Sequence, residues 1–342
     1  MNNSLLLGLQ QFQQWLANEK VSSIFYLFDD NTLKHCKPHI PDSLLQDATS
    51  MVVPHGEDHK TIASCAELWQ QLINKGADRH SILINVGGGM LTDLGGFAAA
   101  TFKRGIRFVN VPTTLLAMVD ASIGNKTGVN FREIKNQIGT FSPAEKIVID
   151  PLFLSTLSDR EWLSGMGEVL KYGLIYRDHL WKQALLVDRN KLPEQLIQNC
   201  IQIKLEVVSQ DPKEHGIRQI LNFGHTIGHG LEAYSHHIHN PLSHGAAVAL
   251  GMAAEAYLSQ EVLDFTELDE VVKGILSLYD IPSWLSALED MNTLLGFIRQ
   301  DKKNVNGQIH CTLLKAIGSA SVGHILTEKQ VEDSIQWLGR QA

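Results

Sequence analysis

The sequence lacks the features of a membrane or secreted protein. Its 342 residues contain no run of about 18 apolar residues, so no membrane-spanning helix is predicted. The first residues lack the basic region and the small-residue cleavage site of a secretory signal. The four cysteines are widely scattered with no CxxC pair, which excludes a cysteine zinc site and is typical of reduced thiols. We therefore expect a cytoplasmic protein that does not bind a membrane.

Basic residues are a minority. Lys and Arg number 29 against 37 Asp and Glu, and the formal net charge is -8. This balance argues against a nucleic-acid-binding surface, which would need clustered positive charge. With 44% hydrophobic and 19% charged residues, the chain falls among ordered globular proteins. Cations that gather in one region would therefore serve a small anionic ligand.

Short β-rich runs alternate with helical stretches in the first half of the chain. The runs that predict buried strands are residues 24–28, 51–53, 82–86, 108–111 and 147–149. Helical patterning covers 61–75 and 93–102. This alternation predicts an α/β, Rossmann-like nucleotide-binding domain with a largely parallel sheet over residues 1–150. Beyond it, Leu, Ala, Glu and Gln dominate, which predicts a mainly α-helical domain over residues 151–342.

A glycine-rich turn follows one of the predicted strands. Gly87, Gly88 and Gly89 lead into a helical pattern, as in turns that let the backbone approach a pyrophosphate at a helix N-terminus. A strict GxGxxG fingerprint fails because Thr92 stands at the third glycine and no acidic residue ends the next strand. The alternative is a tight strand-to-helix turn that binds no ligand.

Polar residues recur at helical spacing in a segment rich in histidine. Residues 222, 225, 229 and 232 follow steps of three, four and three, and Arg218 would extend this stripe. Glycines at 224, 228 and 230 accompany it, although each costs a helix about 1 kcal/mol relative to alanine. The pattern predicts a buried helix whose backbone is pressed against a neighbour and whose polar stripe faces a cleft.

The same segment predicts a metal site. His225 and His229 stand at i and i+4, a spacing that lets both ligate one metal, and His244 could complete the set. Glu168, in an otherwise apolar helical run, is the best candidate for a carboxylate ligand. For any single histidine, the alternative is a buried structural residue. Three histidines in a polar, turn-like segment are expected to be solvated: His236, His237 and His239.

Cations also occur in segments that are otherwise poor in charge. A predicted glycine-containing loop over 120–139 carries Lys126, Lys135 and Asn136. Others follow elsewhere in the chain: Arg104, Lys171, Lys204 and Arg218. In an acidic protein, such a set indicates a site for a substrate with phosphate, carboxylate or both, although each lysine alone fits a solvated surface charge equally well.

Together, these motifs resemble the 3-dehydroquinate synthase family of sugar-phosphate cyclases over nearly the whole chain. The resemblance rests on Gly56-Glu57 with Lys60, 87–93, Arg104-Gly105, 111–116, 120–136, 168–171, 222–229 and His244-Gly245. It implies an N-terminal nucleotide-binding domain, a C-terminal helical metal-binding domain and an active site in the cleft. It also implies a homodimer without nucleic-acid partners.

The activity implied by the resemblance belongs to aromatic amino-acid biosynthesis. It is the conversion of 3-deoxy-D-arabino-heptulosonate 7-phosphate into 3-dehydroquinate and phosphate, with NAD and Zn²⁺ or Co²⁺ as cofactors. NAD oxidises a ring hydroxyl, phosphate is eliminated, the ketone is reduced again and an aldol step closes the new ring. NAD is therefore regenerated in every turnover.

The resemblance also implies roles for individual residues. Glu168, His225 and His244 would hold the metal, whereas His229 would not ligate it but would stand near the phosphate and assist proton transfer. The implied catalytic residues are His229, Lys204, Asp120, Lys126, Arg218 and Asn222. Substrate contacts are implied for Arg104 (from a dimer partner), Lys126, Asn136, Lys171, Lys204, Arg218, Asn222, His229 and Lys315. Cofactor contacts are implied for Asp29, Asn31, Glu57, Lys60, Gly87, Gly88, Gly89, Met90, Asp93, Thr113, Thr114, Asp120, Lys126, Lys135, Phe153, Leu154, Ser155 and Thr156.

Several positions depart from the family pattern. Ala121 and Asn125 replace a typical Ser and Gly in the substrate segment, Pro212 replaces an acidic residue, and Ala246 replaces Glu. The alternatives are a cyclase that forms a valiolone or inosose ring, a metal-dependent polyol dehydrogenase, and a non-catalytic NAD-binding protein. Arg218 and Asn222, which would clamp a carboxylate, argue against the other cyclases. The dehydrogenases typically have an Asp followed four residues later by His, and here Tyr172 stands four residues after Glu168.

Overall fold

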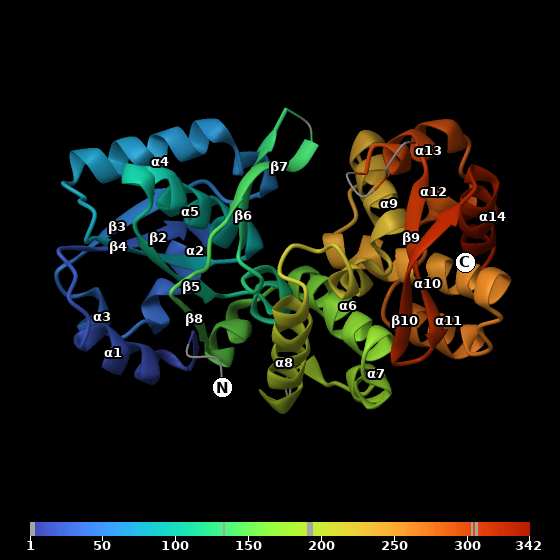
Figure 1. Cartoon of the computed structure of the whole chain (residues 1–342), viewed down its shortest axis with the longest axis horizontal. Coiled ribbons are helices and arrows are strands. Elements are labelled where there is room, and N and C mark those ends of the chain that lie inside the picture. Colours follow the sequence, from blue (N-terminus) through green and yellow to red (C-terminus); the bar gives the residue numbers. More distant parts are fainter. Residues whose placement is uncertain (1–3, 133, 190–193, 302–303, 305–306) are drawn as a thin grey trace. The chain divides into compact units, whose positions relative to one another are not determined.

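Six strands form a parallel sheet in the N-terminal part of the computed structural model, which describes residues 4–132, 134–189, 194–301, 304 and 307–342 (Figure 1). The sheet order is β1-β8-β5-β4-β2-β3, and every neighbouring pair is parallel. The strands are β1 (Leu5–Leu7), β2 (Ile24–Asp29), β3 (Ala48–Val53), β4 (Ile82–Gly87), β5 (Arg107–Pro112) and β8 (Lys146–Ile149). Strands covered on both faces are typically continuous apolar runs, and the five predicted strands are confirmed.

Helices pack against this sheet. The N-terminal unit, Met1–Ser158, contains α1 (Leu9–Ala17), α2 (Asp30–His35), α3 (Asp42–Leu45), α4 (Ile62–Asn74) and α5 (Gly89–Thr101). Its short helical turns are η1 (Lys37–His39), η2 (Glu57–His59), η3 (Phe102–Arg104), η4 (Ala117–Ala121) and η5 (Pro151–Thr156). Leu68 of α4 and Leu94 of α5 join Leu27 and Leu83 of the sheet in one buried core. The predicted α/β architecture is confirmed.

The order of the strands sets the place where a ligand fits. From β2 the chain proceeds outward to β3, whereas from β4 it proceeds to β5 and β8 on the other side. In open parallel sheets, ligands bind outside the carboxyl ends of the strands at such a reversal. Here those ends are Asp29 on β2 and Gly87 on β4.

A β-hairpin replaces the loop predicted over 120–139. Strands β6 (Lys126–Phe131) and β7 (Ile134–Phe141) pair in antiparallel fashion. Gly128 lies opposite Gly139, and a Cβ on Gly128 would come within 2.9 Å of the Ile138 carbonyl oxygen. The glycines that indicated a loop therefore permit a close approach of two strands.

The C-terminal unit, Asp159–Ala342, is mainly helical, as predicted. Its elements are α6 (Asp159–Ile175), α7 (Asp178–Leu185), α8 (Glu194–Gln210), η7 (Ile217–Asn222), α9 (His225–His237), α10 (His244–Leu263), α11 (Leu268–Leu276), α12 (Ser283–Ser286), α13 (Met291–Arg299) and α14 (Glu328–Gly339), with the hairpin of β9 (Ile309–Ala316) and β10 (Ser319–Leu326). Helix α10 is apolar around most of its circumference and packs against α6, α9, α11 and α14, which makes it the centre of this unit.

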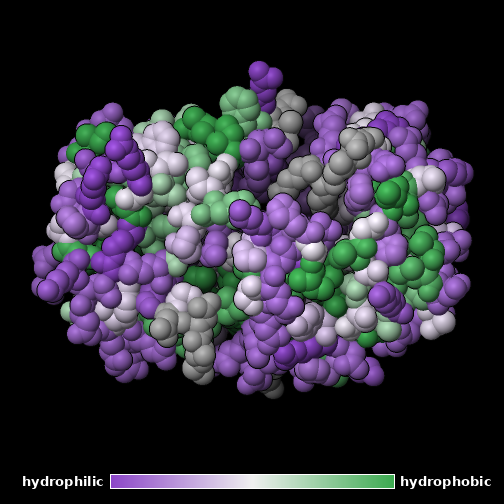
Figure 2. Space-filling view, in the orientation of Figure 1, coloured by the Kyte–Doolittle hydropathy of each residue, from purple (hydrophilic) through white to green (hydrophobic). Residues whose placement is uncertain are grey.

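One face of the molecule is predominantly polar (Figure 2). Hydrophilic residues cover most of the face shown in Figure 2, and hydrophobic residues form scattered groups. Within the described residues, no helix combines the length and apolar character that are needed to cross a membrane.

Candidate active site

The polar stripe predicted over 218–232 is interrupted. Gly224 has a φ of 79° and lies at the N-cap of α9, so the helix begins at His225. Arg218 and Asn222 belong instead to the preceding 3₁₀ helix η7. The prediction of one continuous helical stripe is wrong because the left-handed turn at Gly224 redirects the chain between Asn222 and His225.

Three side chains converge at the candidate metal site. His225 is the first residue of α9, His244 is the first residue of α10, and Glu168 lies within α6. One ligand atom from each lies within 4.8 Å of the other two, and no other residue in the described part of the chain joins this cluster. Nε2 of His225 is 3.4 Å and Nε2 of His244 is 3.9 Å from Oε1 of Glu168. One carboxylate and two imidazoles form a donor set that suits Zn²⁺ or Co²⁺.

Glu168 is a fully buried carboxylate. It forms an ion pair with Lys171, one turn further along α6, but neither of its oxygens accepts a hydrogen bond of regular geometry from a described residue. Burial, and secondarily the charge of Glu168, raise the pKa of nearby Tyr279 far above its usual value. Tyr279 therefore stays neutral and donates to the carbonyl oxygen of Leu163. A buried carboxylate with unused acceptor capacity fits a cation.

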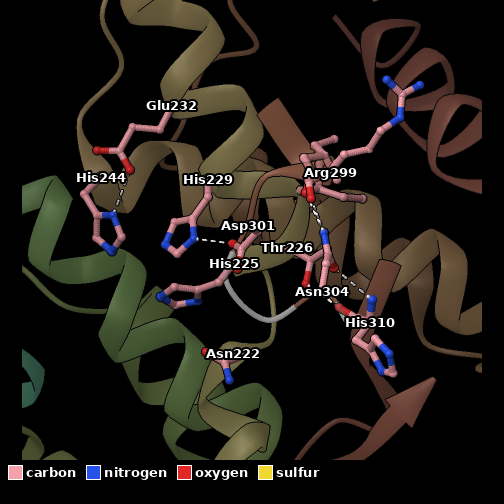
Figure 3. Close-up of polar contacts among 12 residues, drawn as sticks. Asn222, His225, Thr226, His229, Glu232, His244, Arg299, Asp301, Asn304 and His310 are labelled. Carbon is pink, nitrogen blue, oxygen red and sulfur yellow. Dashed lines mark hydrogen bonds and ion pairs between the residues drawn. The ribbon is translucent and has the colours of Figure 1, made fainter. Parts of the chain in front are cut away.

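The two histidines are oriented by their other ring nitrogens. Nδ1 of His225 donates to the carbonyl oxygen of Phe223 at 3.2 Å. Nδ1 of His244 donates to Oε2 of Glu232 at 3.1 Å (Figure 3). Both bonds leave Nε2 free of its proton and directed toward Glu168, as is usual for metal-ligating histidines. The chain therefore presents a set of donors whose tautomers suit a metal.

His229 lies beside this cluster but engages a different partner. Its ring centroid is 5.2 Å from that of His225 and 5.9 Å from that of His244. Its Nδ1 lies 2.8 Å from Oδ2 of Asp301. The alternative that His225 and His229 ligate one metal as a pair does not match this geometry, since His229 is outside the cluster of ligand atoms.

Glycines set the distances among the helices that carry the ligands. A Cβ on Gly167 would come within 2.5 Å of the carbonyl oxygen of Gly245, and one on Gly245 would collide with Ser164. A Cβ on Gly228 would come within 2.9 Å of the Ala247 oxygen and the Val248 Cα. The predicted close approach of the histidine helix to a neighbour is confirmed, and that neighbour is α10.

A buried carboxylate on α10 holds the start of α9. Glu255 is fully buried and accepts backbone hydrogen bonds from Gly224 at 2.6 Å, Thr226 at 3.0 Å and Ile227 at 3.1 Å. These N–H groups belong to the turn that precedes and begins the helix, where the helix dipole also favours a negative charge. Glu255 therefore fixes the position of His225.

The predicted substrate residues of the C-terminal unit are distributed over five elements: Lys171 on α6, Lys204 on α8, Arg218 and Asn222 on η7, His229 on α9 and Lys315 on β9. Lys204 on α8 and Arg218 on η7 are buried, and Lys315 on β9 is exposed. The side chain of Arg218 donates to the Pro212 carbonyl at 2.8 Å, and the amide of Asn222 donates to Glu214 at 2.8 Å. The segment before η7 thus orients both side chains.

Asp211 organises that segment. Its carboxylate accepts hydrogen bonds from the backbone N–H groups of His215, Gly216 and Arg218 at 3.0, 2.7 and 3.1 Å. Burial acts to raise the pKa of Asp211, but the backbone donors outweigh it, so the pKa lies below its usual range. The ionised form is therefore the one that stabilises the fold.

A pH dependence follows from Asp211. Because the pKa is lower in the folded state, the stabilisation is present above the unfolded pKa of about 3.9 and is lost as the pH falls through the folded value. We expect Asp211→Asn to unfold at lower urea concentration than the wild type at pH 6, and this difference to shrink as the pH approaches 3. Urea titrations of both proteins across this range measure it. A difference that stays constant would contradict the role given to the carboxylate.

The predicted cofactor residues lie in the N-terminal unit, around the reversal of the sheet. Gly88 is the N-cap of α5, and no described side chain caps this helix. Asp29 ends β2 and caps α2 by accepting from the Thr32 N–H at 2.7 Å; burial raises the pKa of its carboxyl. The GxGxxG fingerprint places an acidic residue at the end of the strand that follows the glycine turn, whereas Asp29 ends β2, which pairs with β4.

A buried lysine connects the cofactor residues with the hairpin. Nζ of Lys60 donates to Asp93 and to the side-chain oxygen of Asn136, both at 2.6 Å, and lies 3.9 Å from Glu57. Burial acts to lower the pKa of Lys60, but the two carboxylates outweigh it and the pKa is raised, so the ammonium stays charged. The structure therefore brings predicted cofactor residues together with Asn136, a predicted substrate residue.

The remaining predicted residues of this unit occupy several elements. Lys126 pairs with Phe141 at the base of the hairpin, whereas Lys135 lies near its turn, so these two cations are not brought together. Thr113 and Thr156 both form a hydrogen bond with Cys36. Nothing in the sequence indicated that Cys36 lies beside these predicted cofactor residues. Asn31 lies on α2, Met90 on α5, Arg104 on η3, Thr114 before η4, Asp120 on η4, and Phe153, Leu154 and Ser155 on η5.

The supporting residues are Asp211, Glu232, Glu255 and Asp301, all carboxylates that accept hydrogen bonds from site residues or from the backbone beside them. The sequence placed Glu232 in the polar stripe but did not predict the other three as part of the site. The only sequence signal for Glu255 is a charged residue in the strongly apolar run of α10. The three histidines expected to be solvated, His236, His237 and His239, are exposed.

Two family models together match residues 50–304, which contain most of the predicted site residues. Residues 50–164 match the family model described as 3-dehydroquinate synthase N-terminal, and residues 165–304 match the one described as 3-dehydroquinate synthase C-terminal. The 3-dehydroquinate synthase of Parabacteroides distasonis is 41% identical over 334 residues, covering 96% of this chain and 94% of the relative. That of a Synechocystis strain is 40% identical over 293 residues, covering 83% and 81%.

Solved structures show the same fold. A 2-deoxy-scyllo-inosose synthase complexed with carbaglucose-6-phosphate, NAD⁺ and Co²⁺ has a TM-score of 0.84 at 23% identity, covering 97% of this chain and 96% of that one. A 2-epi-5-epi-valiolone synthase from Streptomyces hygroscopicus with NAD⁺ and Zn²⁺ bound has a TM-score of 0.82 at 26% identity, covering 100% and 98%. Given the family models and the curated relatives, this chain belongs to the 3-dehydroquinate synthase family.

Proposed function

We propose that this chain converts 3-deoxy-D-arabino-heptulosonate 7-phosphate into 3-dehydroquinate and phosphate. As a carbon–oxygen lyase of aromatic amino-acid biosynthesis, it would depend on NAD and a divalent metal. The observation that carries the proposal is the 41% identity to a curated 3-dehydroquinate synthase over nearly the full length of both chains. The valiolone and inosose synthases of the same fold are 26% and 23% identical.

The residues present fit the two cofactors. Glu168, His225 and His244 would hold the metal, and the glycine turn with Asp29 would hold NAD at the sheet reversal. When bound, NAD would take up and return a hydride, and the metal would polarise the oxygen on the carbon that is oxidised. The chain itself supplies the binding and orientation of the substrate.

Cations and amides would orient the substrate. Arg218, Lys204 and Asn222 would bind its carboxylate and hydroxyls, and their partners in the segment 211–216 support this role. Further contacts, to phosphate or to the reacting hydroxyls, are proposed for Asp120, Lys126, Asn136, Lys171 and Lys315. His229 would pass a proton near the phosphate, and the hydrogen bond at its Nδ1 supports transfer at Nε2.

Phosphate release tests the reaction. The purified protein, supplied with Zn²⁺, a catalytic amount of NAD and the heptulosonate phosphate, is expected to release phosphate while NADH absorbance stays flat, with 3-dehydroquinate as the product. Accumulating NADH would instead indicate a polyol dehydrogenase, because a cyclase returns the hydride in each turnover. No phosphate release by metal-loaded protein would favour a cyclase for another sugar phosphate, and Ala121 and Asn125 would then be examined first.

We also propose that the enzyme is a cytoplasmic homodimer in which Arg104 reaches the site of the partner. Arg104 is exposed on a turn where Lys103, Arg104 and Gly105 all have positive φ, which supports a role beyond the protomer's own packing. The four cysteines are free and buried, which suits a reducing compartment. Light scattering should give twice the 38.0 kDa chain mass, and a monomer would contradict the proposal.

A further inference from the structure

Asp301 is a buried carboxylate that contacts the proposed proton-transfer residue. It lies two residues beyond the end of α13, and its side chain is 4% exposed. Oδ2 of Asp301 lies 2.8 Å from Nδ1 of His229, so the pair makes a short hydrogen bond (Figure 3). The two residues are 72 positions apart in the sequence, so the fold alone creates this contact.

Hydrogen bonds of Asn304 connect described residues that flank Asp301 in the chain. The side chain of Asn304 donates to the carbonyl oxygen of Ile298 at 2.7 Å and accepts from the N–H of His310 at 3.1 Å. The backbone N–H of Asn304 donates to the carbonyl oxygen of Asp301 at 3.0 Å. Asn304 thus links the end of α13 to the start of β9.

The same segment is tied to the histidine helix. The hydroxyl of Thr226 on α9 donates to the carbonyl oxygen of His310 at 3.0 Å. Gly230 of α9 packs directly on Ile298, because a Cβ there would collide with this side chain. Ile298 and His310, which lie on either side of Asp301 in the chain, therefore both contact the helix that carries His229.

This geometry selects one form of the histidine. An ionised carboxylate accepts hydrogen bonds but cannot donate one, so Nδ1 of His229 must carry a proton to make the contact. In the neutral ring, Nε2 then has a free lone pair. We propose that Asp301 is a positioning residue that holds His229 in the Nδ1-protonated tautomer, with Nε2 as the atom that exchanges a proton with the substrate. This inference rests on the proposed function of His229.

The isosteric variant Asp301→Asn tests the proposal. The amide of asparagine can donate to Nδ1 and stabilise the opposite tautomer while the size of the side chain is kept. We expect kcat to fall about 100-fold, the lower end of what general acid–base catalysis contributes, while KM stays within about threefold because ground-state binding is unchanged. Metal content should equal that of the wild type. A purely structural role would change KM and metal content along with kcat.

Two further variants separate positioning from general damage. In the double variant Asp301→Asn/His229→Gln, kcat should be no lower than in His229→Gln alone, because Asp301 acts only through His229. Asp301→Glu, which retains a carboxylate, should recover part of the kcat lost in Asp301→Asn. The matched control is Asp290→Asn at the exposed N-cap of the same helix, where asparagine caps as well as aspartate; it should leave kcat unchanged.

A spectroscopic measurement keeps the test independent of turnover. In ¹⁵N-histidine spectra of the zinc-loaded resting protein, His229 should be protonated at Nδ1 in the wild type and at Nε2 in Asp301→Asn. If the wild type shows these signals but no phosphate release, the proposed function fails while the positioning role stands. The same tautomer in both proteins, unchanged kcat in Asp301→Asn, or additive losses in the double variant would each overturn the inference.

Discussion

Replacing His244 with alanine is expected to remove the metal and the cyclase activity together. His244 supplies one of only three protein donors in the described cluster, and its Nε2 is oriented by the bond from Nδ1 to Glu232. Loss of a residue that hydrogen-bonds a metal ligand typically lowers metal affinity 10- to 100-fold. Loss of the ligand His244 itself should therefore lower metal affinity more than about 100-fold. Since the bound metal would lower the activation barrier by several kcal/mol, its loss should reduce turnover by at least about 1000-fold.

The measurement is metal content by mass spectrometry after gel filtration, alongside phosphate release. His236→Ala is the control, because His236 lies on the adjacent helix α9 but is exposed and outside the cluster. It should retain both metal and turnover. Full metal content in His244→Ala would show that the triad is not the metal site, whatever happens to the rate.

Replacing Glu255 with alanine is expected to destabilise the C-terminal unit by about 3–5 kcal/mol. The change leaves three backbone N–H groups of the buried turn before α9 without their acceptor, and each unsatisfied donor costs about 1–3 kcal/mol. For a folded unit of this length, such a loss of stability should lower the melting temperature by about 10 °C. Because His225 begins that helix, metal affinity should fall as well.

Thermal unfolding followed by circular dichroism measures this effect. Glu261→Ala on the same helix provides the control, because Glu261 is exposed and the change should alter the free energy of unfolding by less than about 0.5 kcal/mol. Equal melting temperatures for the two variants would mean that water or other groups satisfy the turn, and that Glu255 does not anchor α9.

The sheet could be predicted because its strands are uninterrupted apolar runs bounded by turns. Strand β1 was not predicted because its three leucines lack the β-branched residues that marked the predicted strands, including the equally short runs 51–53 and 147–149. The hairpin of β6 and β7 escaped because Gly128 and Gly139 read as flexible, whereas they face each other across the two strands. Pairing between strands depends on contacts that a local window of sequence does not contain.

The roles of the site residues likewise depend on contacts that a local window of sequence does not contain. Spacing placed His225 and His229 one turn apart and therefore could not separate a ligand from a proton-transfer residue. The distinction lies in the partner of each Nδ1, which is the nearby Phe223 carbonyl for His225 and the distant Asp301 for His229. The left-handed turn at Gly224, which removes Asn222 from the stripe, likewise depends on the packing of that glycine against Met252.

The glycine contacts between the ligand-bearing helices have a consequence for how the enzyme is activated. Main-chain packing at Gly167, Gly228 and Gly245 sets the spacing of the helices that carry the three ligands. Zinc fingers, in contrast, fold only when metal binds. Chelation should therefore leave the helical unit folded, so the metal-free enzyme would be stable. When the ion is added back, the rate of reactivation would be set by the exchange of water on the ion for the three protein ligands. No refolding step would be needed.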